Sequence, residues 1–250
     1  MKIPNTSKSL WVATEKCRGF PALKSDISVD VAIVGGGITG ITAATLLKRA
    51  GLSVAVIEAD RVATGVSGHT TAHLTEATDR SYEDLIKDFG EDGARLAAES
   101  SRAALLRIAG FVREEGIDCD FMKVPAFQYT EDAEMIPMFE AERAAAASIG
   151  VKVTLTHNVP LPFTVKGALR FDNQAQFHPR RYLVPLALAI PGEGSHVFEQ
   201  TQVVDIEDGE PCRLVTQTGT VTARDVIVAT HAPFNNVVLQ TKIASYRSYV

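Results

Sequence analysis

Three closely spaced glycines constrain the fold of this chain more than any other feature of its sequence. Gly35, Gly37 and Gly40 form a GxGxxG pattern. The run 29–34 before them is apolar and rich in β-branched residues, which is typical of a strand buried on both faces of a parallel sheet. A stretch with helical spacing follows the glycines, and a second β-branched run follows that stretch. The segment 29–58 therefore predicts a complete strand–helix–strand unit.

Each glycine of this pattern has a steric reason within such a unit. Gly35 permits the tight turn, Gly37 lets a pyrophosphate approach the backbone, and Gly40 lets the helix pack closely on the strand. The N–H groups at the start of the helix and the positive end of its dipole would then hold the phosphates. In this context the pattern predicts that the chain binds a dinucleotide, and it disfavours a chance glycine turn.

An acidic residue at the end of the second strand extends this interpretation. Glu58 stands about 20 residues after the glycines, where the carboxylate that hydrogen-bonds the ribose hydroxyls is expected. A carboxylate at this position would repel a 2′-phosphate, so NADP is disfavoured. The strand–helix–strand unit alone does not separate FAD from NAD.

The bulk composition excludes several classes of function. The 250 residues are 46% hydrophobic and 22% charged, which is typical of a globular protein. The net charge is −5 and the basic residues are scattered, so we expect no nucleic-acid partner. No apolar run is long enough to span a bilayer, and the N-terminal residues lack the apolar core of a signal peptide. We therefore expect a cytoplasmic protein with no membrane partner.

After the second strand the sequence predicts a loop, then helices, then strands. The loop covers 60–76, and helices are expected from Ser81, from about 91 to 115, after Thr130 and after His178. Short β-type segments fill the C-terminal third: His196–Glu199, Val203–Ile206, Arg213–Thr218 and Val226–Ala229. This order implies an α/β core with a segment inserted into it.

Three segments resemble the FAD-dependent oxidoreductases of the D-amino-acid oxidase superfamily, which includes glycine oxidase and sarcosine oxidase. They are 30–58, the Ser/Gly/Thr-rich loop 63–72 and the late apolar run 223–232. The resemblance implies an α/β fold, with a Rossmann-like FAD-binding domain and an interleaved α+β substrate domain. It also implies FAD as the cofactor. The boundaries that it suggests are an N-terminal extension at 1–28, the FAD-binding domain at 29–115 and 178–235, and part of a substrate domain at 116–177 and 236–250.

By this resemblance a set of residues would surround the cofactor. The loop 67–71 would run beside the pyrophosphate and the flavin ring, the end of the late strand would pass the phosphates again, and the backbone of Val203 would meet the adenine. His231 replaces the family's glycine at the end of that strand. The predicted cofactor-binding residues are Gly35, Gly36, Gly37, Ile38, Thr39, Gly40, Glu58, Ala59, Ser67, Gly68, His69, Thr70, Thr71, Val203, Ala229, Thr230 and His231. For the late strand, an ordinary buried strand is the alternative interpretation.

The chemistry implied by the resemblance is hydride transfer to the flavin from a carbon that bears an amine, which gives an imine that then hydrolyses. Since the cofactor carries out this step, no catalytic side chain is identified. His69 and His73 are the histidines expected nearest the flavin. Thr70 occupies the position through which some relatives attach flavin covalently, so a hydrogen-bonding histidine is favoured over covalent attachment. Arg247, beside Tyr246 on a terminal strand, could pair with a substrate carboxylate or be a solvated strand residue.

A bacterial subgroup, in which a Rieske iron–sulfur domain follows the flavin domain, resembles the stretch 9–75 more closely still. A Rieske centre needs two Cys and two His ligands, whereas Cys17, Cys119 and Cys212 are far apart and form no paired Cys/His pattern. We therefore expect no metal site. Relatives continue well past the equivalent of Val250, so the chain is expected to be C-terminally truncated.

Three functions compete at this point. The first is an FAD-dependent oxidoreductase that oxidises an amine or amino acid, with that small molecule as its partner. The second is an NAD-dependent dehydrogenase, which would need a regular series of strand–helix units after Glu58 instead of the loop in the sequence. The third is a non-catalytic flavin-binding protein left after loss of the C-terminal part.

Overall fold

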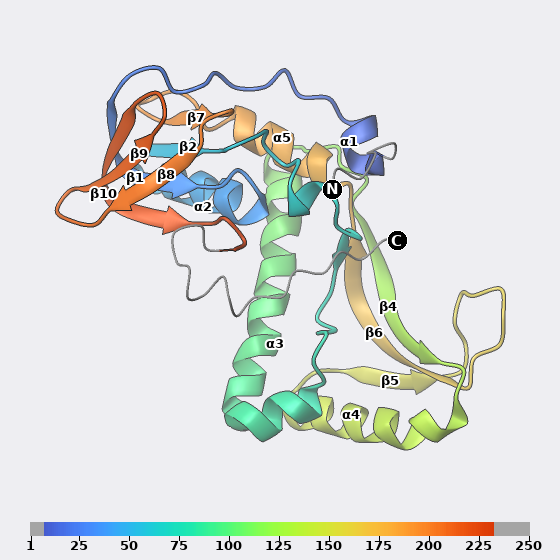
Figure 1. Ribbon diagram of the computed structural model, residues 1–250. Coiled ribbons are helices and arrows are strands. Elements are labelled where there is room, and N and C mark those ends of the chain that lie inside the picture. The colour runs from blue at the N-terminus through green and yellow to red at the C-terminus, as the bar shows by residue number, and fades with distance from the viewer. Residues whose placement is uncertain (1–7, 233–250) are drawn as a thin grey trace, which may run out of the picture. The chain divides into compact units, whose positions relative to one another are not determined.

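The computed structural model describes residues 8–232 of the 250-residue chain (Figure 1). The chain divides into two compact units. Unit 1 comprises Met1–Thr71 and Pro179–Val250, and unit 2 comprises Ala72–His178. No helix within the described residues is long and apolar enough to cross a membrane.

Unit 1 is built on a six-stranded sheet whose described strands follow the order β7-β2-β1-β10-β9-β8. Their bounds are Ile27–Val34 for β1, Val54–Ile57 for β2, His196–Phe198 for β7, Val203–Glu207 for β8, Cys212–Thr216 for β9 and Thr220–Val228 for β10. β1 pairs in parallel with β2 and with β10, and β7 continues the parallel part beside β2. β8, β9 and β10 form an antiparallel meander at the other edge. The predicted strand–helix–strand unit is confirmed, while β10 begins earlier than expected.

Four helical segments accompany this sheet in the described part of unit 1. They are α1 (Leu10–Thr14), α2 (Ile38–Arg49), the 3-10 turn η1 (Val66–Gly68) and α5 (Pro179–Leu188). α2 packs on β1 and β2 and also contacts α5. α5 begins at Pro179, which confirms the helix predicted after His178.

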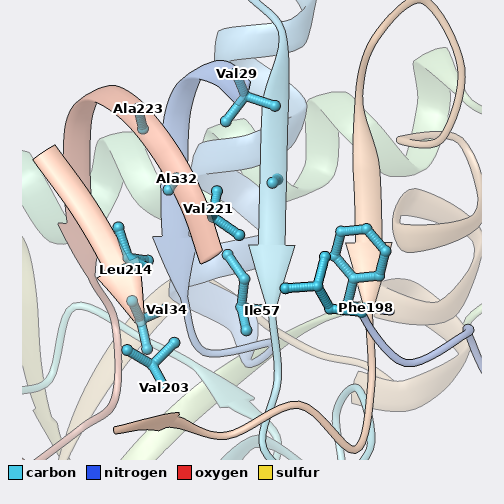
Figure 2. Close-up of a cluster of buried hydrophobic side chains, with 11 residues drawn as sticks. Val29, Ala32, Val34, Ile57, Phe198, Val203, Leu214, Val221 and Ala223 are labelled. Atoms are coloured by element: carbon cyan, nitrogen blue, oxygen red, sulfur yellow. The ribbon is translucent and has the colours of Figure 1, made fainter. Parts of the chain in front are cut away.

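The central strands β1 and β2 are buried on both faces, as their apolar sequences require. Every residue of β2 is buried. Along β1, Ile33 lies close to Gly40 of α2, whereas its neighbours Ala32 and Val34 point to the opposite face, since side chains alternate along a strand. Ala32 and Val34 belong to a cluster of buried side chains (Figure 2), whose other members are Leu23, Val29, Ala55, Ile57, Phe198, Val203, Leu214, Val221 and Ala223. Burial on both faces fixes the register of these strands, because a one-residue slip would exchange the two faces.

Unit 2 is built on an antiparallel sheet with the strand order β3-β6-β4, and β5 also pairs with β6. The strands are β3 (His73–Leu74), β4 (Met122–Thr130), β5 (Val153–Thr156) and β6 (Gly167–Gln176). The helices are α3 (Tyr82–Glu114), the 3-10 turn η2 (Ala133–Met135) and α4 (Ile136–Ser148). Helices and sheet share a core of buried residues: Tyr82, Ala94, Ala98, Phe139, Ala146, Ile149, Val151, Leu169 and Phe171.

The helix starts of unit 2 confirm one expectation and correct another. α3 begins after the Ser81 cap, and Gly90, with a φ of 72°, breaks the helical backbone between the two helices that the sequence predicted. The prediction that Thr130 caps a helix is wrong, because that residue ends β4. Asp132 caps the next turn instead, since its carboxylate accepts a hydrogen bond from the N–H of Glu134 at 2.9 Å.

The compact units also differ from the domain boundaries expected from the sequence. Residues 72–115, placed by the sequence in the FAD-binding domain, lie in unit 2. They do so because α3 packs into the core of that unit through Ala94 and Ala98. Alanines give only a weak hydrophobic period, so the sequence does not show which sheet this helix covers.

Candidate cofactor-binding site

A cavity of about 670 Å³ opens in unit 1 at the ends of its parallel strands. Val34, Ile57 and Val228, the last residues of β1, β2 and β10, belong to its lining. The carboxyl ends of parallel strands are where open α/β sheets bind ligands, and the volume lies in the range of small-molecule and cofactor sites. This cavity is therefore the candidate site.

Two glycines shape the backbone beside this cavity. Gly35 has a φ of 112°, and a side chain there would place its Cβ 2.5 Å from the carbonyl oxygen of Ala229. A Cβ on Gly40 would lie 1.9 Å from the carbonyl oxygen of Gly35. Gly37 belongs to the cavity lining, and a Cβ there would have Ser67 Oγ as its near neighbour at 3.2 Å. Gly35 and Gly40 thus build the turn, and Gly37 leaves room at the cavity.

Helix α2 presents its first turn to the cavity. The first N–H groups of a helix have no partner inside the helix, and here the Ile38 N–H donates a hydrogen bond to Ser67 Oγ at 2.9 Å. Gly37, Ile38 and Thr39 line the cavity. Because the positive end of the helix dipole lies at this point, the site suits an anion such as a pyrophosphate.

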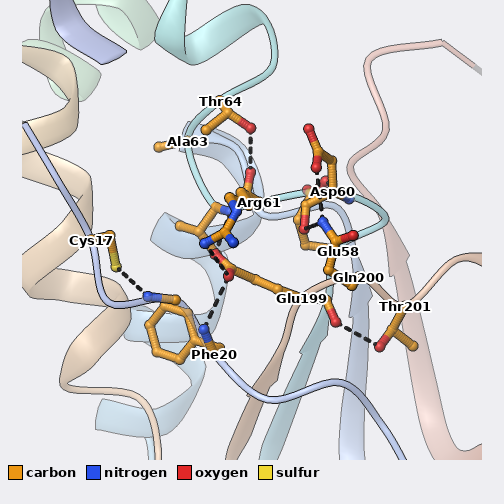
Figure 3. A network of polar contacts seen from close by, with 12 residues as sticks. Cys17, Phe20, Glu58, Asp60, Arg61, Ala63, Thr64, Glu199, Gln200 and Thr201 are labelled. Carbon is orange, nitrogen blue, oxygen red and sulfur yellow. Dashed lines mark hydrogen bonds and ion pairs between the residues drawn. The ribbon is translucent and has the colours of Figure 1, made fainter. Parts of the chain in front are cut away.

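Glu58 follows β2 and is held in place by backbone groups. Its Oε2 accepts a hydrogen bond from the Gly36 N–H at 2.6 Å, and its Oε1 accepts one from the Asp60 N–H at 2.9 Å. Its own N–H donates to the carbonyl of Phe198, and its carbonyl accepts from the N–H of Thr201. Glu58, Asp60 and Thr201 lie near one another in Figure 3. Each carboxylate oxygen retains a further lone pair, so the group can still accept hydrogen bonds from ribose hydroxyls.

The end of β10 passes the same cavity. The Ala229 N–H donates to the carbonyl of Val34 at 2.8 Å, which keeps this segment beside β1 past the last strand residue. His231 belongs to the lining and has a φ of 65°. That left-handed conformation favours glycine, the residue that the family resemblance leads one to expect here. The backbone therefore follows a glycine-like course although a histidine occupies the position.

The cavity brings together most of the predicted cofactor-binding residues. Those in its lining are Gly35, Gly37, Ile38, Thr39, Glu58, Ala59, Ser67, Val203, Ala229, Thr230 and His231. Gly36 and Gly40 lie in the turn beside them, whereas the run from Gly68 through His69 and Thr70 to Thr71 does not belong to the lining. The Nδ1 atom of His69 lies 2.9 Å from the carbonyl oxygen of Gly65. That these residues bind a cofactor stays a prediction.

The lining also contains residues that were not among the predicted cofactor-binding residues. They are Val34, Ile57, Ala63, Gly65, Val66, Thr201, Gln202 and Val228. The strand-end residues among them could have been found, because the last residue of each parallel strand borders a crevice of this kind. Ala63, Gly65 and Val66 lie in the segment 63–72 on which the family resemblance partly rests, but no local pattern defines which residues of this loop line the cavity.

The other candidates lie elsewhere. His73 begins β3 in unit 2 and lines a separate cavity of about 240 Å³. Tyr246 and Arg247 lie outside the described residues. The three cysteines are free thiols, and burial raises the pKa of Cys119 to about 11. Within the described residues, no group of three or more His, Cys, Asp or Glu side chains could hold a metal ion.

The model of a protein family described as FAD dependent oxidoreductase (DAO) matches residues 30–250. Over 246 residues the chain is 37% identical to the putative Rieske 2Fe-2S iron-sulfur protein YhfW of Bacillus subtilis, an alignment that covers 97% of this chain and 48% of that protein. Over 233 residues it is 29% identical to gamma-glutamylputrescine oxidoreductase of Escherichia coli, with 91% of this chain and 55% of the relative covered. The chain thus spans about half the length of the curated relatives it matches.

Solved structures share the fold. Glycine oxidase from Geobacillus kaustophilus gives a TM-score of 0.68 at 24% identity, over 81% of this chain and 55% of that one. L-amino acid deaminase from Proteus myxofaciens gives a TM-score of 0.64 at 19% identity, over 84% of this chain and 47% of that one. The likeness is one of fold, and it confirms the α/β architecture expected from the sequence.

Proposed function

The chain belongs to the family of FAD-dependent oxidoreductases, and on that basis we propose that it binds FAD in the cavity of unit 1 and oxidises an amine or amino acid. One observation carries the cofactor part of the proposal. The glycine turn, the N-terminus of α2 and Glu58 surround a single cavity at the carboxyl ends of β1, β2 and β10. Each of these features suits one part of a dinucleotide.

The residues around the cavity fit the parts of the cofactor. Glu58 would accept hydrogen bonds from the ribose hydroxyls, and the N–H groups at the start of α2 would hold the pyrophosphate. Gly37 carries no side chain that would obstruct this approach, and the backbone of Val203 would meet the adenine. When bound, the flavin supplies the acceptor for a hydride. The role of the chain's own residues is to bind and orient it.

The names of the relatives support the substrate class. Gamma-glutamylputrescine oxidoreductase, glycine oxidase and L-amino acid deaminase are all named for amines or amino acids. A small molecule of this class is therefore the proposed substrate, and the carbon that bears its amine is the proposed hydride donor. No side chain is assigned to catalysis, because the hydride passes to the cofactor.

An NAD-dependent dehydrogenase is the second candidate, and the fold disfavours it. Such an enzyme would continue from β2 with a regular alternation of parallel strands and helices. Here the chain runs from β2 through a loop into unit 2, and antiparallel strands β8–β10 form one side of the sheet in unit 1. The third candidate, a flavin-binding protein without catalysis, differs from the proposal only in its lack of activity.

A visible absorption spectrum of the purified chain, recorded before and after acid precipitation, tests the cofactor. We expect flavin bands that pass into the supernatant, which would indicate non-covalent FAD. Colour that stays in the pellet would indicate covalent attachment and would make His69 the first residue to replace. A colourless protein that also does not bind added FAD would overturn the proposal.

The substrate class is tested by adding candidate molecules to the flavin-loaded protein in the absence of oxygen. We expect an amine or amino acid to bleach the flavin absorbance, because hydride transfer reduces the ring. A hydroxy acid serves as the control and should leave the absorbance unchanged. Bound FAD that no amine or amino acid reduces would favour the non-catalytic candidate instead.

A further inference from the structure

The cofactor loop, defined here as residues 62–71, borders the cavity of unit 1. Ala63, Gly65, Val66 and Ser67 belong to the cavity lining. Apart from the single turn η1, the loop has no regular secondary structure. Its backbone is strained at Ala63, whose φ of 56° lies in the left-handed region. A loop of this kind needs contacts from outside to keep one conformation.

The N-terminal arm, defined as residues 9–21, supplies the first of these contacts. Ser9 Oγ donates a hydrogen bond to the carbonyl of Gly68, and Trp11 Nε1–H donates one to the carbonyl of Thr70 at 2.8 Å. Ser9 Oγ also accepts the Trp11 N–H at 3.2 Å and so caps helix α1. Because one hydroxyl caps α1 and also bonds the loop, the helix and the loop are tied together.

A buried arginine supplies the second contact. Arg180, at the start of α5, is 4% exposed. Its Nη1 donates to the carbonyls of Val62 and Ala63 at 3.1 and 3.0 Å, and its Nε donates to the carbonyl of Glu15 in the arm at 3.3 Å. A single guanidinium therefore links the N-terminal arm to the strained residue of the cofactor loop.

A buried carboxylate supplies the third contact. Glu199, just after β7, is 3% exposed. Its Oε1 accepts a hydrogen bond from the Val62 N–H at 2.8 Å, and its Oε2 accepts one from the Phe20 N–H in the arm at 3.0 Å. Figure 3 shows the second of these contacts. The arm is thus joined to the cofactor loop near both of its ends, either directly or through one buried charged group.

These contacts hold the cofactor loop on both sides of its cavity-lining residues 65–67, and one of them reaches Ala63 in the lining itself. The N-terminal arm lies before the region 30–250 that matches the family. We propose that the arm is a positioning element of the cofactor site, which holds the cofactor loop in the conformation that binds FAD, with Trp11 as its main anchor. The effect passes through Ser67, whose Oγ accepts the Ile38 N–H at the start of α2. This inference rests on the proposed function, because the arm has this role only if the cavity binds FAD.

Replacement of Trp11 by Phe tests the inference directly, since it keeps an aromatic ring and removes the N–H that reaches Thr70. We expect the Kd for FAD to rise about tenfold, because the loop loses the hydrogen bond between Trp11 and the Thr70 carbonyl. Without FAD, we expect the backbone amides of the cofactor loop to exchange hydrogen faster, while those of unit 2 are unchanged. Leu10→Ala is the matched control, because it lies on the same helix with 62% of the residue exposed.

Ser9 offers a second pair of variants. Ser9→Ala removes the hydroxyl that reaches Gly68, whereas Ser9→Thr retains one and can still cap α1. We expect weaker FAD binding for Ser9→Ala and binding close to that of the wild type for Ser9→Thr. This rescue separates the loss of one hydrogen bond from a general disturbance of the arm. It also keeps the test decisive if Trp11→Phe does not fold.

Two results would overturn the inference, and they are distinguishable. If the wild-type chain binds FAD, and Trp11→Phe and Ser9→Ala bind it with the same Kd and show the same loop exchange, the arm has no positioning role and the proposed function stands. If the wild-type chain does not bind FAD, the proposed function falls. The role of the arm then falls with it, whatever the exchange of the loop amides shows.

Discussion

Unit 1 and unit 2 keep their shapes by different means. In unit 1 the turn beside the cavity depends on the absence of side chains, since a Cβ at Gly40 would lie 1.9 Å from the carbonyl oxygen of Gly35. In unit 2 the start of α3 depends instead on a buried side chain. Glu142 of α4 is 8% exposed, and its carboxylate accepts hydrogen bonds from the first N–H groups of α3. The turn in unit 1 therefore tolerates no added atom, whereas unit 2 tolerates poorly the loss of a buried polar group.

Two buried carboxylates of unit 2, Glu76 and Glu142, belong to one connected network of hydrogen bonds. Glu142 of α4 accepts hydrogen bonds from the N–H groups of Tyr82 and Glu83, the first residues of α3, at 2.9 and 3.1 Å. Glu76 accepts two hydrogen bonds from Arg102, at 3.0 and 2.9 Å, and this contact raises the pKa of the Arg102 guanidinium. The Tyr82 hydroxyl donates to the carbonyl of Glu76 at 2.6 Å. The network thereby joins α4, both parts of α3 and the segment before it.

The largest effect is expected from Gly40→Ala in unit 1. The added methyl group would overlap the carbonyl of Gly35, so α2 would have to move away from β1. We expect the free energy of unfolding to fall by about 3 kcal/mol or more, which is at the upper end for overpacking. Urea unfolding followed by circular dichroism measures this loss.

Gly110→Ala in unit 2 is the matched control. Gly110 lies inside α3, and the nearest atom to an added Cβ would be Glu114 Oε1 at 3.5 Å. Since alanine favours a helix interior over glycine, we expect this variant to gain about 0.5–1 kcal/mol. A Gly40→Ala variant as stable as the wild type would contradict the steric account of unit 1.

In unit 2 the corresponding replacement is Glu142→Ala. It would leave the N–H groups of Tyr82 and Glu83 without the carboxylate at the positive end of α3, and we expect a loss of about 2–3 kcal/mol. Glu140→Ala, exposed on the same helix, is the control and should stay within about 0.5 kcal/mol of the wild type. Hydrogen exchange should increase at the start of α3 and not in β1. An equal increase in β1 would show that the two units are not stabilised independently.

The same contrast explains how much of unit 1 could be predicted from the sequence. Gly35, Gly37, Gly40 and Glu58 lie within one strand–helix–strand unit, so local spacing alone defines the turn, the helix start and the carboxylate. The resemblance to the FAD-dependent oxidoreductases, based partly on these residues, is confirmed by the family match. The sequence predicted a loop after Glu58 and expected residues 67–71 beside the cofactor, and Ser67 does line the cavity. The course of this loop could not be predicted, because it depends on Arg180 and Glu199, which are far from it in the sequence.

Unit 2 could not be predicted strand by strand, for two physical reasons. Asn173, with a φ of 61°, interrupts the alternation of buried and exposed residues within β6, so the period-2 signal of this strand is short. The contact between Glu142 and the Tyr82 N–H joins residues 60 positions apart, and no local pattern encodes it. The sequence therefore indicates an α+β segment without placing its strands.

Tyr82 gives unit 2 a dependence on alkaline pH. Burial, together with the negative charges of Glu76 and Glu142, raises the pKa of Tyr82 to about 12, from an ordinary value of about 10. The folded state therefore holds this proton more tightly than the unfolded chain. The contribution of Tyr82 to stability is complete below about pH 10 and is lost as the pH rises toward 12, because the unfolded chain ionises first.

Tyr82→Phe should lower the free energy of unfolding by about 1–2 kcal/mol at neutral pH, because the carbonyl of Glu76 loses its donor. The difference from the wild type should narrow above about pH 10, where the wild type loses the same contribution. Tyr129→Phe, at a residue that is 45% exposed, is the control and should behave as the wild type. Urea unfolding across this range measures the effect, and a difference that stays constant with pH would contradict it.

Asp30 gives unit 1 the opposite dependence, and this effect is expected to be the smallest because the group lies near the surface. Its carboxylate accepts hydrogen bonds from Ser53 Oγ at 2.7 Å and from the Ser53 N–H at 2.8 Å. These hydrogen bonds lower the pKa of Asp30 below its ordinary value. Because the folded pKa is the lower one, the contribution is present above about pH 3.9 and is lost as the pH falls through the folded pKa.

We expect Asp30→Asn to remove this acid-side contribution, since the amide carries no charge for Ser53 to stabilise. Ser53→Ala should remove most of the same contribution, so the double variant should add little to either single one. Unfolding curves from about pH 6 down to about pH 3 measure the effect, because this range spans the ordinary carboxyl pKa. Fully additive losses would show that Asp30 and Ser53 do not act as a pair. If the losses of unfolding free energy are instead non-additive and confined to acid, Asp30 and Ser53 account for the acid side of the stability profile in unit 1. Tyr82 would then account for its alkaline side in unit 2.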